Sequence, residues 1–546
     1  MKAFIIKNAY FLITVVLFAL SELIVNPRGE FPLNDDWSYT KSLLLLHETG
    51  KFTVGEFAAM TLFTHVMWGE LFVRIFGFSF FILRFSTFIS ALTGVYFLQR
   101  MISSSTGKPV LGFLAGLTLL FNPVYFNVTN TFLTDISFNT LVILCCYCAW
   151  MFFNTHNAWW YALAFVFSLL LVLVRQFGLI VPFCLAFSSM FLAKRRTIFI
   201  FAGITGTILV IVVFKLYEVY LKSFLSPGSA YVYSGTVALG DPKEWERMLL
   251  NFLYRFNVSW MHILIFSFPF VVMFLPSLLW SFKIKVIAGI LLICALCDYF
   301  FFIGAVFPHH NIFLNMSLGP DTFYESVTSG IIHTYSRTFG KIATALKFIL
   351  CGAGMLILAL LAIRNKDKLK VIWSDPQSIF AVSLFTGYLL ILYTANSFFD
   401  RYHLPLLSVG LILFSGAAKH LPFDYRWFII PMAFYYYVAV AGTRDYMTMN
   451  RTKWEAYDYI HYKQKVPLQK INGGFEINNW NDGKHLWWAD FTHLDFDYLI
   501  QYSEEKDFRK LKAFPFRRFF PYRMDTIFLF ERTAPGIPAV AAEQKQ

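Results

Sequence analysis

The sequence predicts a polytopic α-helical membrane protein that carries a small α/β domain near its C-terminal end. Of its 546 residues, 57% are hydrophobic and 14% are charged, and the mean hydropathy is +0.57. Soluble domains of ordinary size cannot bury that much apolar surface. Apolar runs of membrane-spanning length recur as far as residue 441, and the chain becomes polar after about residue 442.

About thirteen apolar runs approach the length that crosses a bilayer. They lie at 8–26, 80–98, 109–126, 132–153, 158–174, 176–193, 197–219, 259–281, 285–304, 341–363, 377–395, 404–418 and 427–441. The first run follows Lys2 and Lys7, and no convincing small-residue cleavage site comes after it. We therefore interpret it as a retained signal-anchor helix.

Basic residues between these runs predict the orientation of the chain. When the spans are threaded in order, one side collects Arg100, Lys108, 194–196, Lys283, Lys285, 364–370 and Lys419. Loops rich in Lys and Arg stay in the cytoplasm, so we expect a cytoplasmic N-terminus and an external region after residue 442. The same rule explains the net charge of +13, and no nucleic-acid partner is predicted.

The threading places segments 27–79, 220–258, 305–340 and the chain after 442 on the outer side. Within the first of these, residues 37–46 and 61–76 have helical apolar spacing that charged residues interrupt. This pattern predicts helices that lie along the membrane interface.

Composition divides the chain into three predicted parts. Residues 1–442 form the transmembrane catalytic domain, and 443–532 form an external α/β domain with a helix near 453–462, a turn at 472–474 and strands at 497–502 and 526–530. Residues 533–546 are rich in Pro, Ala and Gln, which favours a disordered tail.

Two adjacent carboxylates, Asp35 and Asp36, follow the first span within the sequence Asn-Asp-Asp-Trp-Ser-Tyr at 34–39. Carboxylates are costly beside hydrocarbon, so a pair at the exit of a span is a candidate catalytic site. An acidic N-cap on a helix that runs through Ser42 to His47 requires the same residue types. The sequence alone leaves both interpretations open.

Further polar residues reach the same outer side in the threaded chain. Asp135 stands at the entrance of the fourth span, Arg175 lies between the fifth and sixth, and Arg401 with Tyr402 precedes the twelfth. Both arginines run against the positive-inside trend, which indicates either an anionic partner at headgroup level or side chains that reach back to the interface. Carboxylates beside arginines suit the transfer of a sugar from a lipid phosphate. A carboxylate can act as general base toward the acceptor hydroxyl, and arginine or a metal can stabilise the departing phosphate.

A divalent metal ion is the one candidate cofactor. Its candidate ligands are His65, Glu70, His309 and His310, because histidine and carboxylate side chains bind divalent ions. The alternative is that these are ordinary surface residues, which are commoner than metal sites.

Taken in order, these features resemble the glycosyltransferase C superfamily, nearest to the lipid A aminoarabinose transferases and the protein O-mannosyltransferases (ArnT/PMT-like). The resemblance spans most of the chain, and it is specific in the order and sidedness of its motifs rather than in any one of them. The motifs are Asp35, Asp36 and Tyr39, Phe-Gly-Phe-Ser at 76–79, Leu-Arg-Phe-Ser at 83–86, Thr134 and Asp135, and Arg-Tyr-His-Leu-Pro at 401–405.

The resemblance implies a polyprenyl-phosphate-linked sugar as donor and inverting transfer outside the cytoplasmic (inner) membrane of a bacterium. The acceptor is expected to be lipid A or another lipid, a glycan or a protein. Asp35 matches the family's leading catalytic acid and Asp36 its acidic neighbour, and we expect Asp135 to share their site. We assign the donor phosphate to Arg401, Arg175, Tyr402 and Tyr39. The family's Pro-rich element before the second interfacial helix is replaced here by Met-Thr-Leu-Phe-Thr-His at 60–65.

Two other function classes fit a polytopic chain. A transporter or flippase of lipid-linked substrate would place ionisable groups near mid-membrane and often shows two related halves. The predicted spans contain few such groups, chiefly Lys215 and Asp298 near span ends, and the sequence has no obvious internal repeat. A polysaccharide polymerase or ligase is the third class.

Overall fold

The computed structural model describes residues 2–302, except 56, 193–194, 226–228, 230 and 232–241. It also describes residues 312, 313 and 316, and residues 337–533 except 367–374, 396–397, 483–495, 503, 506 and 521.

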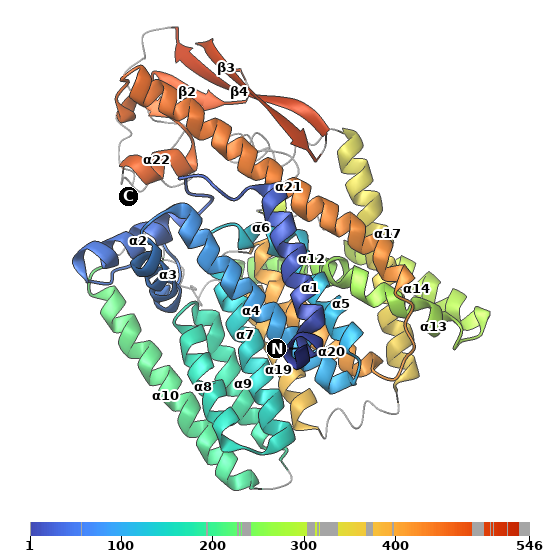
Figure 1. Cartoon of the computed structure of the whole chain (residues 1–546). Helices are drawn as coiled ribbons and strands as arrows, with labels where there is room; N and C mark the ends of the chain where they lie inside the picture. Colours follow the sequence, from blue (N-terminus) through green and yellow to red (C-terminus); the bar gives the residue numbers. More distant parts are fainter. Residues whose placement is uncertain are drawn as a thin grey trace.

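Helices make up most of the described chain (Figure 1). In order they are α1 (Lys2–Val25), α2 (Asp36–Thr49), α3 (Phe63–Phe76), α4 (Phe80–Thr106), α5 (Pro109–Leu120), α6 (Pro123–Thr129), α7 (Thr134–Thr155), α8 (Ala158–Val172), α9 (Ile180–Ser189), α10 (Arg196–Lys222), α12 (Pro242–Val271), α13 (Leu275–Leu279), α14 (Ile284–Phe302), α17 (Arg337–Arg364), α19 (Pro376–Thr394), α20 (Leu404–Ala418), α21 (Arg426–Asp458) and α22 (Phe475–Asp482). Short 3₁₀ turns η1 (Gln176–Leu179) and η3 (Asp400–His403) precede α9 and α20.

The membrane character predicted from the sequence is confirmed. Within the described residues, seven helices are long and apolar enough to cross a membrane: Asn8–Val25, Phe80–Thr106, Thr134–Thr155, Arg196–Lys222, Phe252–Leu279, Lys341–Arg364 and Pro376–Thr394. Helices α5 and α6 pass the same test only as a pair bent by 68°, and α8 and the segment Gln176–Ser189 are apolar but shorter. The number of thirteen spans therefore stays a prediction.

The bend between α5 and α6 has a local cause. Asn122 caps α6 by accepting hydrogen bonds from the backbone N–H groups of Val124 (3.0 Å) and Tyr125 (3.2 Å), and Pro123 follows at the first helical position. Proline lacks the N–H group that would continue α5, whereas it suits the start of a new helix. One apolar run in the sequence is thus two helices in the fold.

The first outer segment contains the two predicted interfacial helices, α2 and α3. Gly69 lets α3 pack closely, because a Cβ atom at this position would lie 2.4 Å from the Phe132 ring. Helix α12 begins at Pro242, so the last part of the predicted outer segment 220–258 is helical, and its position outside the membrane stays a prediction. Most of segment 305–340 and the whole 533–546 tail after Thr533 lie outside the described residues.

The C-terminal region forms a four-stranded sheet in the order β1-β2-β4-β3. Strand β1 (Ile471–Asn472) is parallel to β2 (Tyr498–Gln501), and β2 and β3 (Phe508–Phe519) are antiparallel to β4 (Tyr522–Arg532). The strands expected at 497–502 and 526–530 are confirmed as β2 and β4. Strand β3 is not apparent in the sequence, because basic residues alternate there with aromatic ones.

Helix α21 links the helical bundle to this sheet. It passes residue 442 without a break and packs alongside β3 (Figure 1). Helix α22 contacts α2, so the C-terminal region lies at the same end of the bundle as α2 and α3 (Figure 1). This arrangement brings residues from the last hundred positions next to the carboxylates near the N-terminus.

Candidate active site

The loop that carries Asp35 is held by Arg84 of α4. The buried Arg84 guanidinium donates from Nη1 to the carbonyl oxygens of Pro27 (2.8 Å) and Gly29 (2.9 Å) and from Nη2 to that of Phe31 (2.5 Å). A guanidinium offers several donors in a fixed planar fork, so these bonds fix the loop's course. The Leu-Arg-Phe-Ser motif at 83–86 thus supports the site from a neighbouring helix.

Asp36 faces the protein interior. Its Oδ1 accepts a hydrogen bond from the Leu33 N–H (2.6 Å) and its Oδ2 accepts one from the Phe132 N–H (3.2 Å). Burial raises the pKa of the Asp36 carboxyl to about 7, although the Arg84 charge and the two N–H donors lower it. The side chain therefore ties the α1–α2 loop to the loop before α7, and both of its oxygens are occupied by backbone groups.

This geometry predicts that Asp36→Asn mainly lowers stability. An amide has one acceptor oxygen, and its NH₂ group would face a backbone N–H, so one buried donor loses its partner at a cost of about 1–3 kcal/mol. We expect a lower apparent unfolding temperature for the detergent-purified variant, measured beside Asp35→Asn as the isosteric control. An unchanged unfolding temperature together with lost turnover would instead place Asp36 in the chemistry.

Asp35 points toward the other candidate residues. Its side chain is 14% exposed, and Oδ2 lies 2.7 Å from Nη2 of Arg401. Asp35 occupies the N-cap position of α2, yet its carboxylate makes no capping hydrogen bond to that helix within the described residues. The N-cap alternative therefore accounts for the position of Asp35 but not for the contact that its carboxylate makes.

Arg401 joins two carboxylates that come from distant parts of the chain. Its side chain is 1% exposed; besides the Asp35 contact, its Nε lies 3.7 Å from Oδ2 of Asp135. Arg175 Nη2 lies 2.9 Å from the same Asp135 oxygen, and Arg175 Nε donates to Thr134 Oγ1 at 2.7 Å. We call Asp35, Asp135, Arg175 and Arg401 the charge cluster. Two carboxylates balance two guanidinium groups in it.

Two tyrosines, Tyr39 and Tyr402, lie beside the charge cluster. The Tyr402 ring lies 4.9 Å from the Arg175 guanidinium and 5.8 Å from that of Arg401, within the range of cation–π attraction. Burial, with a further contribution from Asp35, raises the pKa of Tyr39, whereas Arg401 and Arg175 lower it. The net shift is upward, so the Tyr39 phenol stays protonated and keeps a hydroxyl donor beside the charge cluster.

Several buried polar atoms of the charge cluster lack hydrogen bonds. Within the part of the chain that the structure describes, these atoms are Arg401 Nε and Nη1, Arg175 Nη2 and both Asp135 oxygens. The contacts of Arg175 and Arg401 with Asp135 are close ion pairs without hydrogen-bond geometry. Buried polar groups in native proteins are nearly always paired, so this arrangement fits a site that a polar ligand completes. Unpaired guanidinium donors suit a phosphate.

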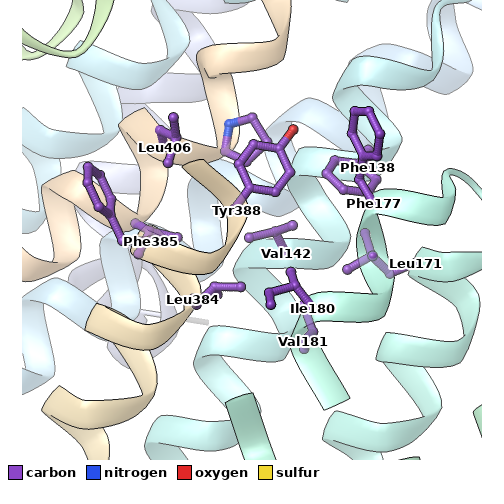
Figure 2. Close-up of a pocket in the computed structure, with 13 residues that line it drawn as sticks. Phe138, Val142, Leu171, Phe177, Ile180, Val181, Leu384, Phe385, Tyr388 and Leu406 are labelled. Carbon is purple, nitrogen blue, oxygen red and sulfur yellow. The ribbon is translucent and has the colours of Figure 1, made fainter. Parts of the chain in front are cut away.

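An apolar cavity adjoins the charge cluster. It is small, about 10 Å³ or room for about one water molecule, and is lined from α7, α8, η1, α9, α19 and α20 (Figure 2). Tyr388 links it to the cluster by donating a hydrogen bond to the Tyr402 carbonyl oxygen (3.2 Å), and the Phe177 ring lies 6.2 Å from the Tyr402 ring. Figure 2 shows Phe138, Phe177 and Tyr388 around this space. An apolar lining therefore lies close to the arginines.

The metal candidates fall into two groups. His65 uses both ring nitrogens, on Ser137 Oγ (2.9 Å) and the Phe132 carbonyl oxygen (3.1 Å), and burial lowers its pKa to about 4. Glu70 Oε1 contacts Arg74 Nε (2.6 Å) and His47 Nδ1 (3.2 Å). No three His, Cys, Asp or Glu side chains gather for a metal in the described residues. The other two candidates, His309 and His310, lie outside them, so the metal stays a prediction.

The C-terminal region contributes residues that the sequence analysis did not identify. Lys453 of α21 and Glu476 of α22 form an ion pair (3.2 Å), and Lys41 of α2 donates to the Asn479 carbonyl oxygen (2.6 Å). The buried Tyr446 hydroxyl makes no hydrogen bond within the described chain. It interacts electrostatically with Glu476, Asp36, Asp35 and Arg401. The sequence pattern that could have identified Tyr446 and Lys453 is their spacing with Asn450. Residues at these intervals lie on one face of a helix, here one that continues past residue 442.

Comparisons with known proteins found similar structures but no similar sequence. No family model and no curated sequence matches the chain. Two similar solved structures are those of ArnT from Cupriavidus metallidurans, a protein of the family that the sequence resembles. The apo form has 12% identity and a TM-score of 0.39, with 85% of this chain and 83% of that chain covered. The form bound to undecaprenyl phosphate has 12% identity and a TM-score of 0.40, with 97% and 98% covered.

A third similar structure is the oligosaccharyltransferase of Archaeoglobus fulgidus tethered to an acceptor peptide. It has 12% identity and a TM-score of 0.33, and the match covers 85% of this chain and 59% of that chain. Likeness of this degree does not by itself extend the activity of either protein to this chain.

Proposed function

We propose that this chain is a membrane glycosyltransferase. It takes a sugar from a polyprenyl-phosphate donor and transfers it, with inversion, to an acceptor outside the cytoplasmic membrane of a bacterium. The observation that supports this most is the charge cluster itself: Asp35 contacts Arg401 at 2.7 Å, while Arg401 Nη1 has no partner in the described chain and Arg175 Nη2 contacts Asp135 without a hydrogen bond.

In this proposal the donor phosphate binds Arg401 and Arg175. Their planar guanidinium groups match phosphate oxygens in pairs, and the unpaired Nη1 of Arg401 is available without breaking the Asp35 contact. The prenyl units nearest the phosphate enter between Phe138, Phe177 and Tyr388, and the small cavity there widens to admit them. Tyr402 holds the Arg175 guanidinium against its ring, which limits the directions in which that arginine can point.

Asp35 acts on the acceptor hydroxyl. The acceptor oxygen bonds to the anomeric carbon, the bond between that carbon and the phosphate oxygen breaks, and Asp35 takes the hydroxyl proton as general base or first orients the hydroxyl. Polyprenyl phosphate leaves with the bonding electrons. A direct displacement of this kind inverts the anomeric centre.

The buried charge stays constant during this step. The donor phosphodiester carries one negative charge, and the departing phosphate monoester carries two. Asp35 loses its negative charge when it takes the proton, so the total for the cluster and phosphate does not change. This balance favours the reaction because charge that develops at a water-poor site is costly unless fixed groups compensate for it.

The transporter alternative has less support. Glu22 of α1 is buried with Asn130 as its partner (3.1 Å), and Asp298 of α14 lies near Lys347 of α17. These pairs are separate from the charge cluster, which lies at the end of the bundle that carries α2 and the sheet (Figure 1).

Proteoliposomes separate the two functions. We expect the purified protein to release free polyprenyl phosphate from polyprenyl-phosphate sugars when cell-envelope extract supplies acceptors, and to leave nucleotide sugars intact. Mannosyl, glucosyl and aminoarabinosyl donors would be compared. Movement of the intact lipid-linked sugar across the bilayer without cleavage of its sugar–phosphate bond would favour the flippase alternative and contradict the proposal.

A further inference from the structure

A second apolar cavity lies between the helical bundle and the C-terminal hairpin. Its volume is about 70 Å³, and its lining comes from α6, α12, α17, α21 and the turn between β3 and β4. Lining side chains include Pro123, Ile265, Phe313, Leu346, Tyr435 and Phe520. It shares no lining residue with the cavity next to Arg175, so the two spaces are separate, and the second is the larger.

One wall of the second cavity is attached to the charge cluster. Asp400 accepts hydrogen bonds from the backbone N–H groups of Phe313 (2.8 Å) and Ile312 (3.3 Å), and Phe313 lines the cavity. Asp400 also accepts a bond from the N–H of Arg401 (2.7 Å). Each cavity is therefore linked to a residue next to Arg401 in the sequence. The second cavity is linked to Asp400, and the first cavity is linked to Tyr402.

The hairpin turn that closes the second cavity is held by a polar network. Asp445 of α21 accepts hydrogen bonds from the N–H groups of Phe519 (2.7 Å) and Phe520 (2.6 Å). Arg518 donates to the carbonyl oxygens of Met316 and Phe520, each at 3.0 Å. These bonds fix Phe520 as part of the cavity wall.

Basic side chains surround this turn. The Arg444 guanidinium lies 4.1 Å from the Phe519 ring, Arg517 is exposed, and Arg523 is 51% exposed. Together with the buried Arg518 they outnumber the acidic groups that the described residues place beside them, Asp445 and Asp525. A basic rim next to an apolar cavity has the charge pattern of a site for an anionic lipid, with the chain inside and the headgroup at the rim.

We propose that the second cavity binds a hydrocarbon chain of a phosphate-bearing lipid whose headgroup lies against Arg444, Arg517 and Arg523, and that this lipid is the sugar acceptor. The second part rests on the proposed function. The occupant is a lipid because an apolar lining cannot satisfy a peptide or glycan backbone, and it is anionic because the rim is basic. The link through Phe313 and Asp400 brings the acceptor to the Asp35–Arg401 pair beside the donor.

Binding can be tested without any transfer reaction. The probe is phosphatidic acid with a photoreactive diazirine near the end of one acyl chain, added to the purified full-length protein. Ala343→Trp fills the cavity from α17, and Ile349→Trp adds the same bulk to the exposed face of that helix. We expect labelled peptides from α12, α17 and α21, and at least about fivefold less labelling in Ala343→Trp, because the indole occupies the space that the acyl chain would enter. Ile349→Trp should label like the wild type.

A second set of variants tests whether the lipid headgroup binds the basic side chains at the hairpin turn. Arg517→Gln with Arg523→Gln should reduce labelling by phosphatidic acid, whereas Arg509→Gln, near the other end of the β3–β4 ladder, should not. Unfolding temperatures of all variants are measured first. Equal labelling of Ala343→Trp and Ile349→Trp, or loss of labelling when polyprenyl phosphate is added, would overturn the proposal of a separate lipid site.

Transfer of labelled sugar then identifies the acceptor. In membranes of the source cells, we expect the label to enter a lipid-extractable product other than the donor, and at least about fivefold less of it with Ala343→Trp than with Ile349→Trp. Label that enters only protein or water-soluble glycan would overturn the acceptor assignment while the proposed function stands. Failure of the wild type to release polyprenyl phosphate would instead contradict the proposed function.

Discussion

Asp35→Asn is expected to lower turnover by about 10²-fold or more, which is the usual scale for removing a general base. The amide keeps the size of the side chain but cannot take the acceptor proton. It also has no negative charge to lose when the departing phosphate gains one, so the buried charge would no longer stay constant. The measurement is the rate of polyprenyl phosphate release in proteoliposomes at saturating donor, with folding checked by thermal unfolding.

Asp36→Asn is the matched comparison because it makes the same change one residue along the chain. Asp35→Asn should retain the wild-type unfolding temperature within a few degrees, since the amide oxygen can still accept the hydrogen bond from Arg401 and Asp135 stays beside that arginine. The two substitutions should therefore have different effects: Asp35→Asn should lose turnover, and Asp36→Asn should lose stability. Wild-type turnover in a folded Asp35→Asn protein would remove the base from the mechanism.

Arg401→Lys should weaken donor binding by tenfold or more, about 1.4 kcal/mol, although the positive charge is kept. The Arg401 guanidinium contacts Asp35 and Asp135 and still has Nη1 unpaired. A lysine ammonium is a single point charge that cannot span these partners and also pair with phosphate oxygens. The affinity for polyprenyl phosphate and the kcat/KM for its sugar conjugate should fall together.

Arg74→Lys is the control for this substitution. Arg74 also pairs with a carboxylate, that of Glu70, but its side chain is 65% exposed. We expect it to bind polyprenyl phosphate as the wild type does. An Arg401→Lys variant with unchanged donor affinity would show that the phosphate binds elsewhere. Arg401→Ala is less informative because it leaves buried carboxylates unpaired, which by itself can cost several kcal/mol of stability.

The charge cluster could be assembled from the sequence because threading the spans in order assigns each polar residue to one end of the bundle. Asp135 begins α7, and Arg175 and Arg401 lie in turns between helices, so a consistent alternation brings them to the side of Asp35. What threading cannot give is the direction of a side chain. Asp35 and Asp36 are equivalent in the sequence, and only the Leu33 and Phe132 N–H groups distinguish the roles that we assign to them.

The contributions of the C-terminal region escaped prediction for a different reason. Strand β3 places Phe514 and Phe516 on its buried face, but the intervening charges resemble those of a solvated surface. Tyr446 and Lys453 lie on the part of α21 that continues beyond its apolar stretch, where the sequence indicates a new domain. Their place beside α2 and α22 depends on contacts between segments about 400 residues apart, such as Lys41 with Asn479.

The central claim is that one sugar moves from one polyprenyl phosphate for each turnover at the Asp35–Arg401 pair. The most direct test supplies the purified protein with a donor labelled in both its sugar and its phosphate, together with envelope extract, and follows both labels. We predict equal amounts of released polyprenyl phosphate and glycosylated acceptor, with inverted configuration at the anomeric carbon, and the loss of both in Asp35→Asn. Intact donor recovered after incubation with the folded wild-type protein, or product formed at the same rate by Asp35→Asn, would contradict the claim.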